Sequence, residues 1–338
     1  MVRCIRILAL TAACLLVMIS CQRKRQYFPH SLPEQEVEII RFDSALLGIR
    51  AEHAAEDVRA LYIDYPDFMP AFVEQALRVN AIDTDYLAEA LPLFISDTLY
   101  GFQQTNKLVQ ETFSDMHGIQ KELSQAFTRL RYLYPKIHVP DIYTFVSGFN
   151  AAVLFLEDDN MAVGLDMYLG SDYPYYNQVV YNYQKQTMRP ECIAGDIVSG
   201  YLFMHFPFAS SKGRLIDNML YRGKLMYVCY NLLNEPAYEV MGYTIEQWQW
   251  CEKYEQQVWN RMMDKRDLFK TEQMVLTSYL NDAPFTAEIS QEAPPRIGTW
   301  IGWRIVESYM EHHPEVSLQE LVDNNDAEQI LRDSYYRP

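Results

Sequence analysis

The hydrophobic residues of this chain change their spacing twice, and this change restricts the fold more than any other feature of the sequence. Up to about residue 135 the apolar side chains recur at helical spacing. Three short β-prone runs follow, in PDIYTFVSGFN, AAVLFLE and MAVGLDMYL, and helical spacing returns from about residue 190. Helices on both sides of a few strands predict an α+β protein, mainly helical with a small central sheet, because βαβ units would alternate the two patterns.

The residues that end each pattern locate the expected elements. Proline, asparagine and aspartate follow the helical stretches, as is usual where helices stop. The expected helices of the first block cover residues 43–66, 71–80, 85–97 and 115–135. Those of the second block cover residues 190–204, 214–231, 244–264, 271–281, 298–312 and 325–332. A short strand is expected in VEIIRF, residues 37–42, and a hairpin turn in EDDN, residues 157–160.

The first twenty residues form a segment of their own. A basic start, MVRCIR, precedes an apolar stretch, ILALTAACLLVMI, that is too short to span a bilayer as a stable helix. Ser20 then precedes Cys21, which resembles a lipobox and implies cleavage before Cys21 and a diacylglyceryl group on its sulfur. Met18 is less usual than leucine at its position, so an ordinary secretory signal with an incidental cysteine is the alternative.

These features divide the chain into three expected parts. Residues 1–20 are a lipoprotein signal peptide, and residues 21–36 are a polar, proline-containing tether. Residues 37–338 are expected to form a single α+β domain, with a helical N-terminal part to about residue 138 and a second part over residues 139–338.

The composition argues against one class of partner and one class of site. The chain has 29 Lys and Arg and 45 Asp and Glu, a formal net charge of −16, which becomes −18 when Arg3 and Arg6 leave with the signal peptide. An acidic domain repels nucleic acid, so no nucleic-acid partner is expected. Cys192, Cys229 and Cys251 stand in apolar contexts and form no CxxC pair. Buried thiols are therefore expected, with one oxidised pair as the alternative.

Two further stretches predict packing or contact surfaces. The tyrosine-rich stretch DYPYYNQVVYNYQ, residues 172–184, has the composition of an interface if it is exposed and of a core with polar handles if it is buried. A mixture of the two is favoured. In IGTWIGWRIV, Gly298 and Gly302 are four residues apart, which allows another helix to approach closely.

The expected helix in RPECIAGDIVSGYLF, residues 189–203, carries most of the chemical interest. It follows a β-prone run and has Glu191 and Asp196 near its start, as does the central helix of many metal-dependent hydrolases. The two carboxylates are five residues apart and do not share a helix face, and Glu191 suits a capping role. No HExxH, HxxEH, GxSxG or phosphate-binding glycine motif occurs. Spacing alone therefore assigns no catalytic residue, cofactor or metal.

Seven stretches spread through most of the mature sequence carry a family resemblance. They are IIRFDSAL, YPDFMPAF, YTFVSGFN, GLDMYLGSDYPYY, GYTIEQWQWCEKYEQQVW, LNDAPFT and RIGTWIGWRIVESYM. In these stretches the chain resembles the gliding-motility-associated lipoprotein GldB family. The resemblance implies an envelope lipoprotein that is associated with gliding machinery in some bacteria and also occurs in non-gliding relatives. It also implies a distant likeness to predicted zinc metallopeptidases, and hence a zincin-like, degenerate metallopeptidase core.

The likeness to those peptidases aligns their HExxH helix with the stretch described above. Gly195 then stands at the first histidine, Asp196 at the glutamate and Ser199 at the second histidine. Arg222, in MLYRGKLMYV, stands where many family members have a glutamate. A guanidinium cannot ligate zinc, and Asp196 alone would hold the ion too weakly, so the resemblance implies that the metal site is lost. Asp196 is expected to pair with Arg222 if the two helices face each other.

Together these expectations describe a non-catalytic protein. The expected function is that of an envelope lipoprotein, a structural or binding component of gliding-motility or related machinery, and thus a pseudoenzyme. The expected partners are the membrane, through the lipid on Cys21, and unidentified envelope proteins. No acidic run follows Cys21, which favours the outer membrane with the domain facing the periplasm. The alternatives are a residual metal-dependent peptidase, using His205 or an unrecognised site, and a peptide- or glycan-binding protein that uses the inherited cleft.

Overall fold

The computed structural model describes residues 26–80 and 83–338. The predicted signal peptide and the predicted lipidation site, Cys21, lie outside these residues. Leu32–Pro338 form one compact unit. The described end of the preceding unit, residues 26–31, contains no helix or strand.

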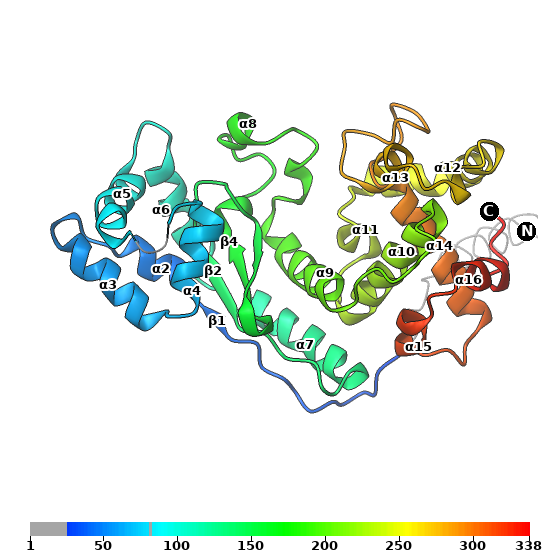
Figure 1. Cartoon of the computed structure of the whole chain (residues 1–338), viewed down its shortest axis with the longest axis horizontal. Helices are drawn as coiled ribbons and strands as arrows, with labels where there is room; N and C mark the ends of the chain where they lie inside the picture. Colours follow the sequence, from blue (N-terminus) through cyan, green and yellow to red (C-terminus); the bar gives the residue numbers. More distant parts are fainter. Residues whose placement is uncertain (1–25, 81–82) are drawn as a thin grey trace, which may run out of the picture. The chain divides into compact units, whose positions relative to one another are not determined.

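A four-stranded mixed sheet joins distant parts of the chain (Figure 1). Its strands, in spatial order, are β1 (Ile39–Ile40), β2 (Ile142–Phe145), β4 (Met161–Gly164) and β3 (Val153–Phe155). β1, β2 and β4 are parallel, and β3 pairs antiparallel with β4 at the edge. Each β-prone stretch of the sequence contributes one strand, and the elements around the sheet are helices. The prediction of a mainly helical α+β fold with a small sheet is therefore confirmed.

The predicted turn between β3 and β4 is present as a 3-10 turn over Glu157–Asp159. Asp158 and Asp159 both adopt left-handed backbone conformations, with φ angles of 56° and 63°. Aspartate enters this region more readily than most residues because its short polar side chain can bond locally. The turn leads into β4, in which all four residues are buried. A short strand covered on both faces has such a continuous apolar sequence.

The helices before and beside β2 form an aromatic core. Their bounds are α2 (Phe42–Leu47), α3 (Ala54–Asp64), α4 (Phe68–Ala71), α5 (Thr84–Ser96), α6 (Phe102–Thr112) and α7 (His117–Leu133), with a π-helical turn over Phe72–Leu77. The ring of Phe42 packs edge-to-face on Phe68 and Phe72, and Phe72 packs in the same way on Phe145 of β2. All four rings are buried, so the first helical block is seated directly on the sheet.

The helix α6 was not predicted from the hydrophobic pattern. Its buried residues are Thr105, Asn106 and Val109, so two of the three are polar. The Thr105 hydroxyl lies 2.6 Å from the Tyr173 hydroxyl. A polar contact to the tyrosine-rich stretch thus helps to seat α6, and an apolar stripe could not reveal it.

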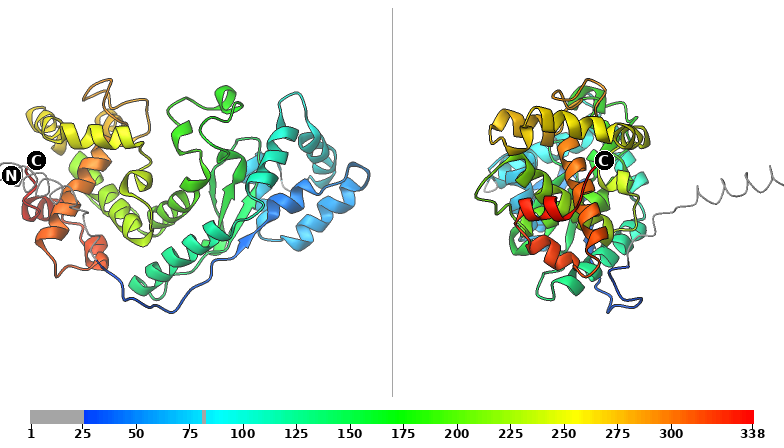
Figure 2. Two further views of the ribbon diagram at one scale, coloured as in Figure 1. Left: turned by 180° about the vertical axis from the view of Figure 1, so that it is seen from behind. Right: turned by 90° about the vertical axis from the view of Figure 1, so that its right-hand side faces the viewer.

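All the helices predicted after residue 190 are present, with ends that differ by a few residues. The helices of this part are α8 (Tyr176–Val179), α9 (Ile193–His205), α10 (Leu215–Leu232), α11 (Ala237–Val240), α12 (Ile245–Asp264), α13 (Gln273–Leu280), α14 (Ile297–His312), α15 (Leu318–Asp323) and α16 (Ala327–Asp333). The short helices α8, α11 and α15 were not predicted. The helices α7 and α9 lie against each other, and α9 also packs on β3 and β4 (Figures 1 and 2).

The helices α10 and α14 approach each other at their backbones. A Cβ atom on Gly302 would lie 1.9 Å from the carbonyl oxygen of Met219, and one on Gly223 would lie 2.3 Å from the carbonyl carbon of Gly302. Only glycine leaves room for this crossing. The close packing predicted for Gly302 is confirmed. Gly298 lies instead against α13, where its Cβ would be 3.0 Å from the Tyr279 carbonyl oxygen.

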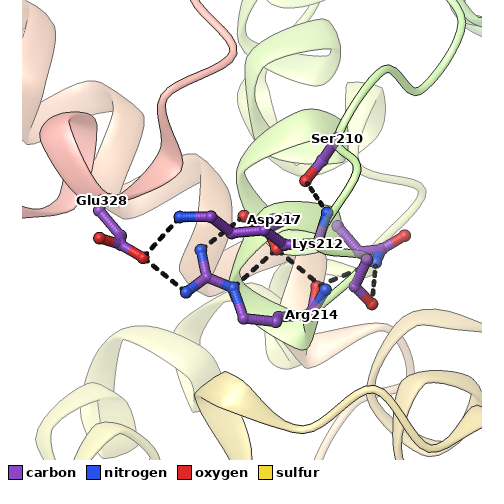
Figure 3. Close-up of polar contacts among 7 residues, drawn as sticks. Ser210, Lys212, Arg214, Asp217 and Glu328 are labelled. Atoms are coloured by element: carbon purple, nitrogen blue, oxygen red, sulfur yellow. Dashed lines mark hydrogen bonds and ion pairs between the residues drawn. The ribbon is translucent and has the colours of Figure 1, made fainter.

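A charged cluster fixes the start of α10 to α16 (Figure 3). The backbone N–H of Arg214 donates to Asp217 Oδ2 at 2.9 Å, so the Asp217 side chain satisfies the N–H of the residue before the helix. The Arg214 guanidinium donates to Asp217 at 2.9 Å and to Glu328 of α16 at 2.6 Å. Lys212 adds a bond to Glu328 at 2.9 Å. The cluster thereby connects residues 114 positions apart in the sequence.

Within residues 26–80 and 83–338, no helix combines the length and the apolar character that crossing a bilayer requires. The three cysteines in these residues, Cys192, Cys229 and Cys251, are buried, as predicted.

Candidate functional site

A cavity of about 350 Å³ lies along the first half of α9. Gly195, Asp196 and Ser199 line it from the helix. The remaining walls come from the turns after β4, the tyrosine-rich stretch, α10, α11 and the loop before α14. Three of the four residues singled out by the resemblance to peptidases therefore line one cavity, whereas Arg222 is not part of its wall.

The sequence of α9 explains how it presents Asp196 and Ser199 to this cavity. Pro190 opens a 3-10 turn, Pro190–Cys192, that leads into the helix. The helix is otherwise strongly apolar, and most of its residues as far as Leu202 are buried. Asp196 and Ser199 are three positions apart and therefore share one helix face. Gly200 is close to β3, since a Cβ atom on it would lie 3.2 Å from the Phe155 ring.

The carboxylate of Asp196 is the chemically distinctive group in the cavity. The Tyr168 hydroxyl donates to Asp196 Oδ2 at 2.8 Å. Burial raises the pKa of Asp196 from 3.8 to about 6, although the hydrogen bond from Tyr168 and the positive charge of Arg296 both lower it. Burial also raises the pKa of Tyr168 well above its usual value, so the phenol keeps its proton and acts as the donor.

The other charged side chains of the wall form ion pairs. Arg296 Nε lies 2.9 Å from Asp282 Oδ1. The Arg296 guanidinium also donates to the Met241 carbonyl at 2.6 Å, which holds it against the end of α11. Glu239 on α11 pairs with Arg189, with an Nη2–Oε2 distance of 2.6 Å. Asp196 is therefore the wall carboxylate without an ion pair in the described part of the chain.

The predicted ion pair between Asp196 and Arg222 is wrong. Arg222 on α10 donates from Nη1 to the Leu280 carbonyl at 2.5 Å. That carbonyl belongs to the last residue of α13, where helical carbonyls lack partners within the helix. Burial lowers the pKa of Arg222, and the nearby charge of Arg296 lowers it further. Arg222 therefore donates to the carbonyl at the end of a helix, whereas Asp196 accepts from the phenol of a tyrosine.

The residues at the aligned positions do not fit a zinc ion. Gly195 has no side chain, and the Ser199 hydroxyl donates to the Asp196 carbonyl of its own helix at 3.3 Å. Zinc in proteins is held by several Cys, His, Asp or Glu side chains. In the part of the chain that the structure describes, three or more such residues nowhere gather in a way that could hold a metal ion.

A buried carboxyl group, that of Glu235, lies beside Gly195 of α9. Both side-chain oxygens of Glu235 are buried without a hydrogen-bond partner among the described residues. Oε2 lies 3.4 Å from the position that a Cβ atom on Gly195 would occupy. Burial raises the pKa of Glu235 to about 8, and the negative charge of Glu122 adds to this effect. Glu235 is therefore largely protonated at neutral pH.

His205, the residue considered for residual hydrolysis, lies at the other end of α9. Its Nε2 is 3.6 Å from Asp159 Oδ1 in the turn between β3 and β4. Its ring packs on Tyr201, with the centroids 4.2 Å apart. Burial lowers its pKa. His205 is not part of the cavity wall.

Sequence reasoning missed several residues of the site, although some stood in stretches already noted. Tyr168 is in GLDMYLG, and Arg296 ends the EAPPR segment before α14. The i, i+3 spacing of Asp196 and Ser199 was a usable signal for a shared face. Nothing in the sequence around Glu235 indicates that its carboxyl group is buried next to α9.

Comparison with known proteins identifies the family. A family model described as gliding motility protein GldB, whose label marks it as a lipoprotein family, matches residues 28–338. No curated protein and no solved structure matches the chain significantly. Because the family model covers nearly the whole chain, this protein belongs to the GldB family of gliding motility lipoproteins.

Proposed function

We propose that this chain is a non-catalytic envelope lipoprotein that serves as a structural or binding component of gliding-motility or related cell-envelope machinery. One observation carries the proposal. The positions that would supply zinc ligands and the general base hold Gly195, Asp196 and Ser199, and the one carboxylate among them is hydrogen-bonded to a tyrosine. Such a site lacks the ligands that would lower the pKa of a metal-bound water.

The anchor proposed for this protein is a lipid on Cys21. Membership in a lipoprotein family supports it. The basic residues Arg23, Lys24 and Arg25 follow at once and would lie near the headgroups of the anchoring leaflet. The absence of an acidic run after Cys21 favours the outer membrane with the domain facing the periplasm.

The proposed architecture is a degenerate zincin-like core over residues 139–338 within a single domain that begins at residue 37. Two features support it. The apolar helix α9 packs on the buried strand β4 and carries its acid in the first turn. In addition, β1 and β2 pair with each other although they lie on opposite sides of residue 138.

The proposed loss of catalysis is tested by metal content and peptide cleavage. The full chain, extracted from membranes in mild detergent, is assayed for zinc by mass spectrometry and for cleavage of a mixed peptide library with and without chelator. We expect far less than one zinc ion per chain and no chelator-sensitive cleavage. Stoichiometric zinc together with chelator-sensitive cleavage would overturn the proposal and support the residual peptidase.

A binding role has one specific observation in its favour, the cavity beside α9. A structural component without a ligand would gain nothing from an unpaired carboxylate in a cavity wall, because partly desolvating a charge costs stability. Crosslinking in intact cells followed by purification of the adducts would identify the envelope proteins that contact the domain. If no crosslinked envelope protein is recovered above the level seen with an unrelated lipoprotein, the proposal of a machine component fails.

A further inference from the structure

The cavity beside α9 contains one charge that no residue of opposite sign pairs with. Asp196 lies in its wall, and a tyrosine hydroxyl occupies only Oδ2. Among the described residues no hydrogen bond reaches Oδ1. Glu239 is neutralised by Arg189. Asp282 is neutralised by Arg296. The cavity therefore presents a net negative charge of one carboxylate to whatever enters it.

Much of the remaining wall is apolar. The larger apolar side chains that line the cavity include Met167, Val180, Met188, Phe203, Met226 and Val240. Methionine side chains are flexible and polarisable and adapt to ligands of irregular outline. A ligand that satisfies both parts of the wall carries a positive charge at the end of an apolar stem.

The size of the cavity restricts the ligand further. A volume of about 350 Å³ is near the lower limit for ligand sites and suits a small molecule or one side chain. The tyrosine-rich stretch contributes Tyr183 and the exposed Gln184 to the wall. Tyr183 stacks on the exposed Tyr181 with ring centroids 5.8 Å apart. These groups offer hydrogen bonds and a flat aromatic surface to the part of a ligand that stays outside.

We propose that the cavity binds the alkylammonium side chain of a peptide, a lysine or another diamino-acid residue, with its ammonium group on Asp196 Oδ1. The methylene stem lies along the methionines, as lysine stems commonly cover apolar surface. Tyr168 acts as a positioning residue that occupies Oδ2 and leaves Oδ1 to the ligand. The inference rests on the proposed function, since a zinc ion on Asp196 would occupy the same carboxylate.

An amino sugar also carries an ammonium group, and polar side chains of the wall such as Gln186 and Thr187 would bond only some of its hydroxyl groups. Others would face apolar side chains such as Met167 and Val180 without hydrogen-bond partners. The wall chemistry therefore favours the peptide side chain, and the amino sugar becomes an outcome of the test.

A ligand series on the unaltered full chain in detergent tests the charge and the stem separately. The probes are Nα-acetyl-lysine amide, Nα-acetyl-norleucine amide, which keeps the stem without the ammonium, and glucosamine, with binding measured by calorimetry. We expect the lysine amide to bind at least roughly tenfold more tightly than the other two, because a charged hydrogen bond is lost in the norleucine amide. Equal binding of the norleucine amide would overturn the proposal, and tighter binding of glucosamine would overturn the assignment to a peptide.

Two variants locate the site. Asp196→Asn keeps an acceptor for Tyr168 but removes the charge, and we expect roughly tenfold or greater loss of affinity for the lysine amide. Glu191→Gln is the matched control, because Glu191 precedes the same helix but is exposed and outside the cavity wall. Unchanged affinity in Asp196→Asn, or an equal loss in Glu191→Gln, would exclude this carboxylate as the binding group.

The zinc content and the ligand series together distinguish a failure of this inference from a failure of the proposed function. Zinc-free chain that binds none of the probes would refute the alkylammonium site and leave the non-catalytic role standing. Zinc-loaded chain that cleaves peptides, and that gains lysine-amide binding only after chelation, would refute the non-catalytic role and keep the site. The ligand series needs no substitution, so it remains decisive if Asp196→Asn does not fold.

Discussion

One half-buried carboxylate determines the chemistry at the scale of residues. Asp196 lies on a strongly apolar helix, and only one of its oxygens receives a hydrogen bond, from Tyr168. Partial burial of a charge with so few partners costs folding free energy, and it also raises the pKa of the group. Such a cost is common at functional positions, where burial tunes a group for binding or catalysis. Glu239 on the same wall already forms an ion pair, so a cationic ligand would gain less from it.

The substitution Asp196→Asn should stabilise the chain at pH 8 but not at pH 4. The pKa of Asp196 is raised from 3.8 to about 6 in the folded chain, so the folded state holds this proton more tightly than the unfolded state. The stabilisation that the bound proton gives the folded state is complete below about pH 4 and is lost as pH rises through about 6. This pKa shift corresponds to about 3 kcal/mol of folding free energy that the chain with Asp196 loses at pH 8. The chain with the neutral asparagine does not lose it. Thermal unfolding at the two pH values measures the difference.

The control for this titration is Glu191→Gln, which should change stability little at either pH. The ionisable groups that interact with Asp196 are Tyr168, Cys192, Glu235, Asp282 and Arg296. Glu235 titrates at about pH 8, so the measurement at pH 8 is repeated in a Glu235→Gln background. An Asp196→Asn effect of the same size at pH 4 and pH 8 would contradict a raised pKa at this position.

Sequence reasoning at this scale found positions but not partners. The resemblance singled out Gly195, Asp196 and Ser199, and the structure places all three along one cavity. The partner of Asp196 is Tyr168, 28 positions away. Arg222 was assigned the wrong partner because it lies near an end of α13, whose carbonyl groups are invisible in a sequence. Which distant group fills a hydrogen bond depends on how helices pack, and local spacing does not contain that information.

At the scale of elements, Gly302→Ala should destabilise the chain by about 1–3 kcal/mol, the usual cost of overpacking. The added methyl group would lie 1.9 Å from the Met219 carbonyl oxygen, so α10 and α14 would have to separate. Urea unfolding monitored by tryptophan fluorescence gives the change. The control is Gly118→Ala in α7, where nothing lies within 4 Å of the new Cβ and a small gain in helix stability is expected. Equal effects of the two substitutions would contradict the close crossing.

The junction between α10 and α16 should depend on salt. Glu328 accepts bonds from Lys212 and Arg214, and these bonds lower its pKa to about 2. Glu328→Gln should lower the Tm in dilute buffer, and the difference from the unaltered chain should shrink at about 1 M salt, because exposed pairs are screened. Glu292→Gln is the control, since this carboxylate forms no ion pair among the described residues. A Tm difference that salt leaves unchanged would show that the cluster acts through packing alone.

The elements that could be predicted are those with a continuous apolar face. The long helices α10, α12 and α14 were expected within a few residues of their ends. The helix α6 was missed because Thr105 and Asn106 occupy its buried side. Short helices such as α11 have a single turn, too little for a period to be recognised.

At the scale of the whole molecule, the sheet couples segments that the sequence presents as separate blocks. β1 pairs with β2 although about a hundred residues of helices lie between them in the chain, including α7. The helices α7 and α9 then pack on each other, which links the first helical block to the cavity wall. Contacts between such distant segments cannot be inferred from periodicity, which reports only which face of each element is buried.

The attachment of the molecule to its membrane gives the last prediction. Cys21 lies outside the described residues, and its lipidation is expected from the lipobox-like sequence and the family. Cys21→Ser removes the sulfur that would carry the diacylglyceryl group, so labelling of the protein by an alkyne fatty acid fed to cells should disappear. Cys251→Ala, which alters a buried free thiol, should label normally. Persistent labelling of Cys21→Ser would refute the anchor, and loss of labelling in both variants would point to failed export rather than to the modified residue. Because two acyl chains hold a protein on a bilayer far more firmly than one, retention of the labelled chain in washed membranes completes the test.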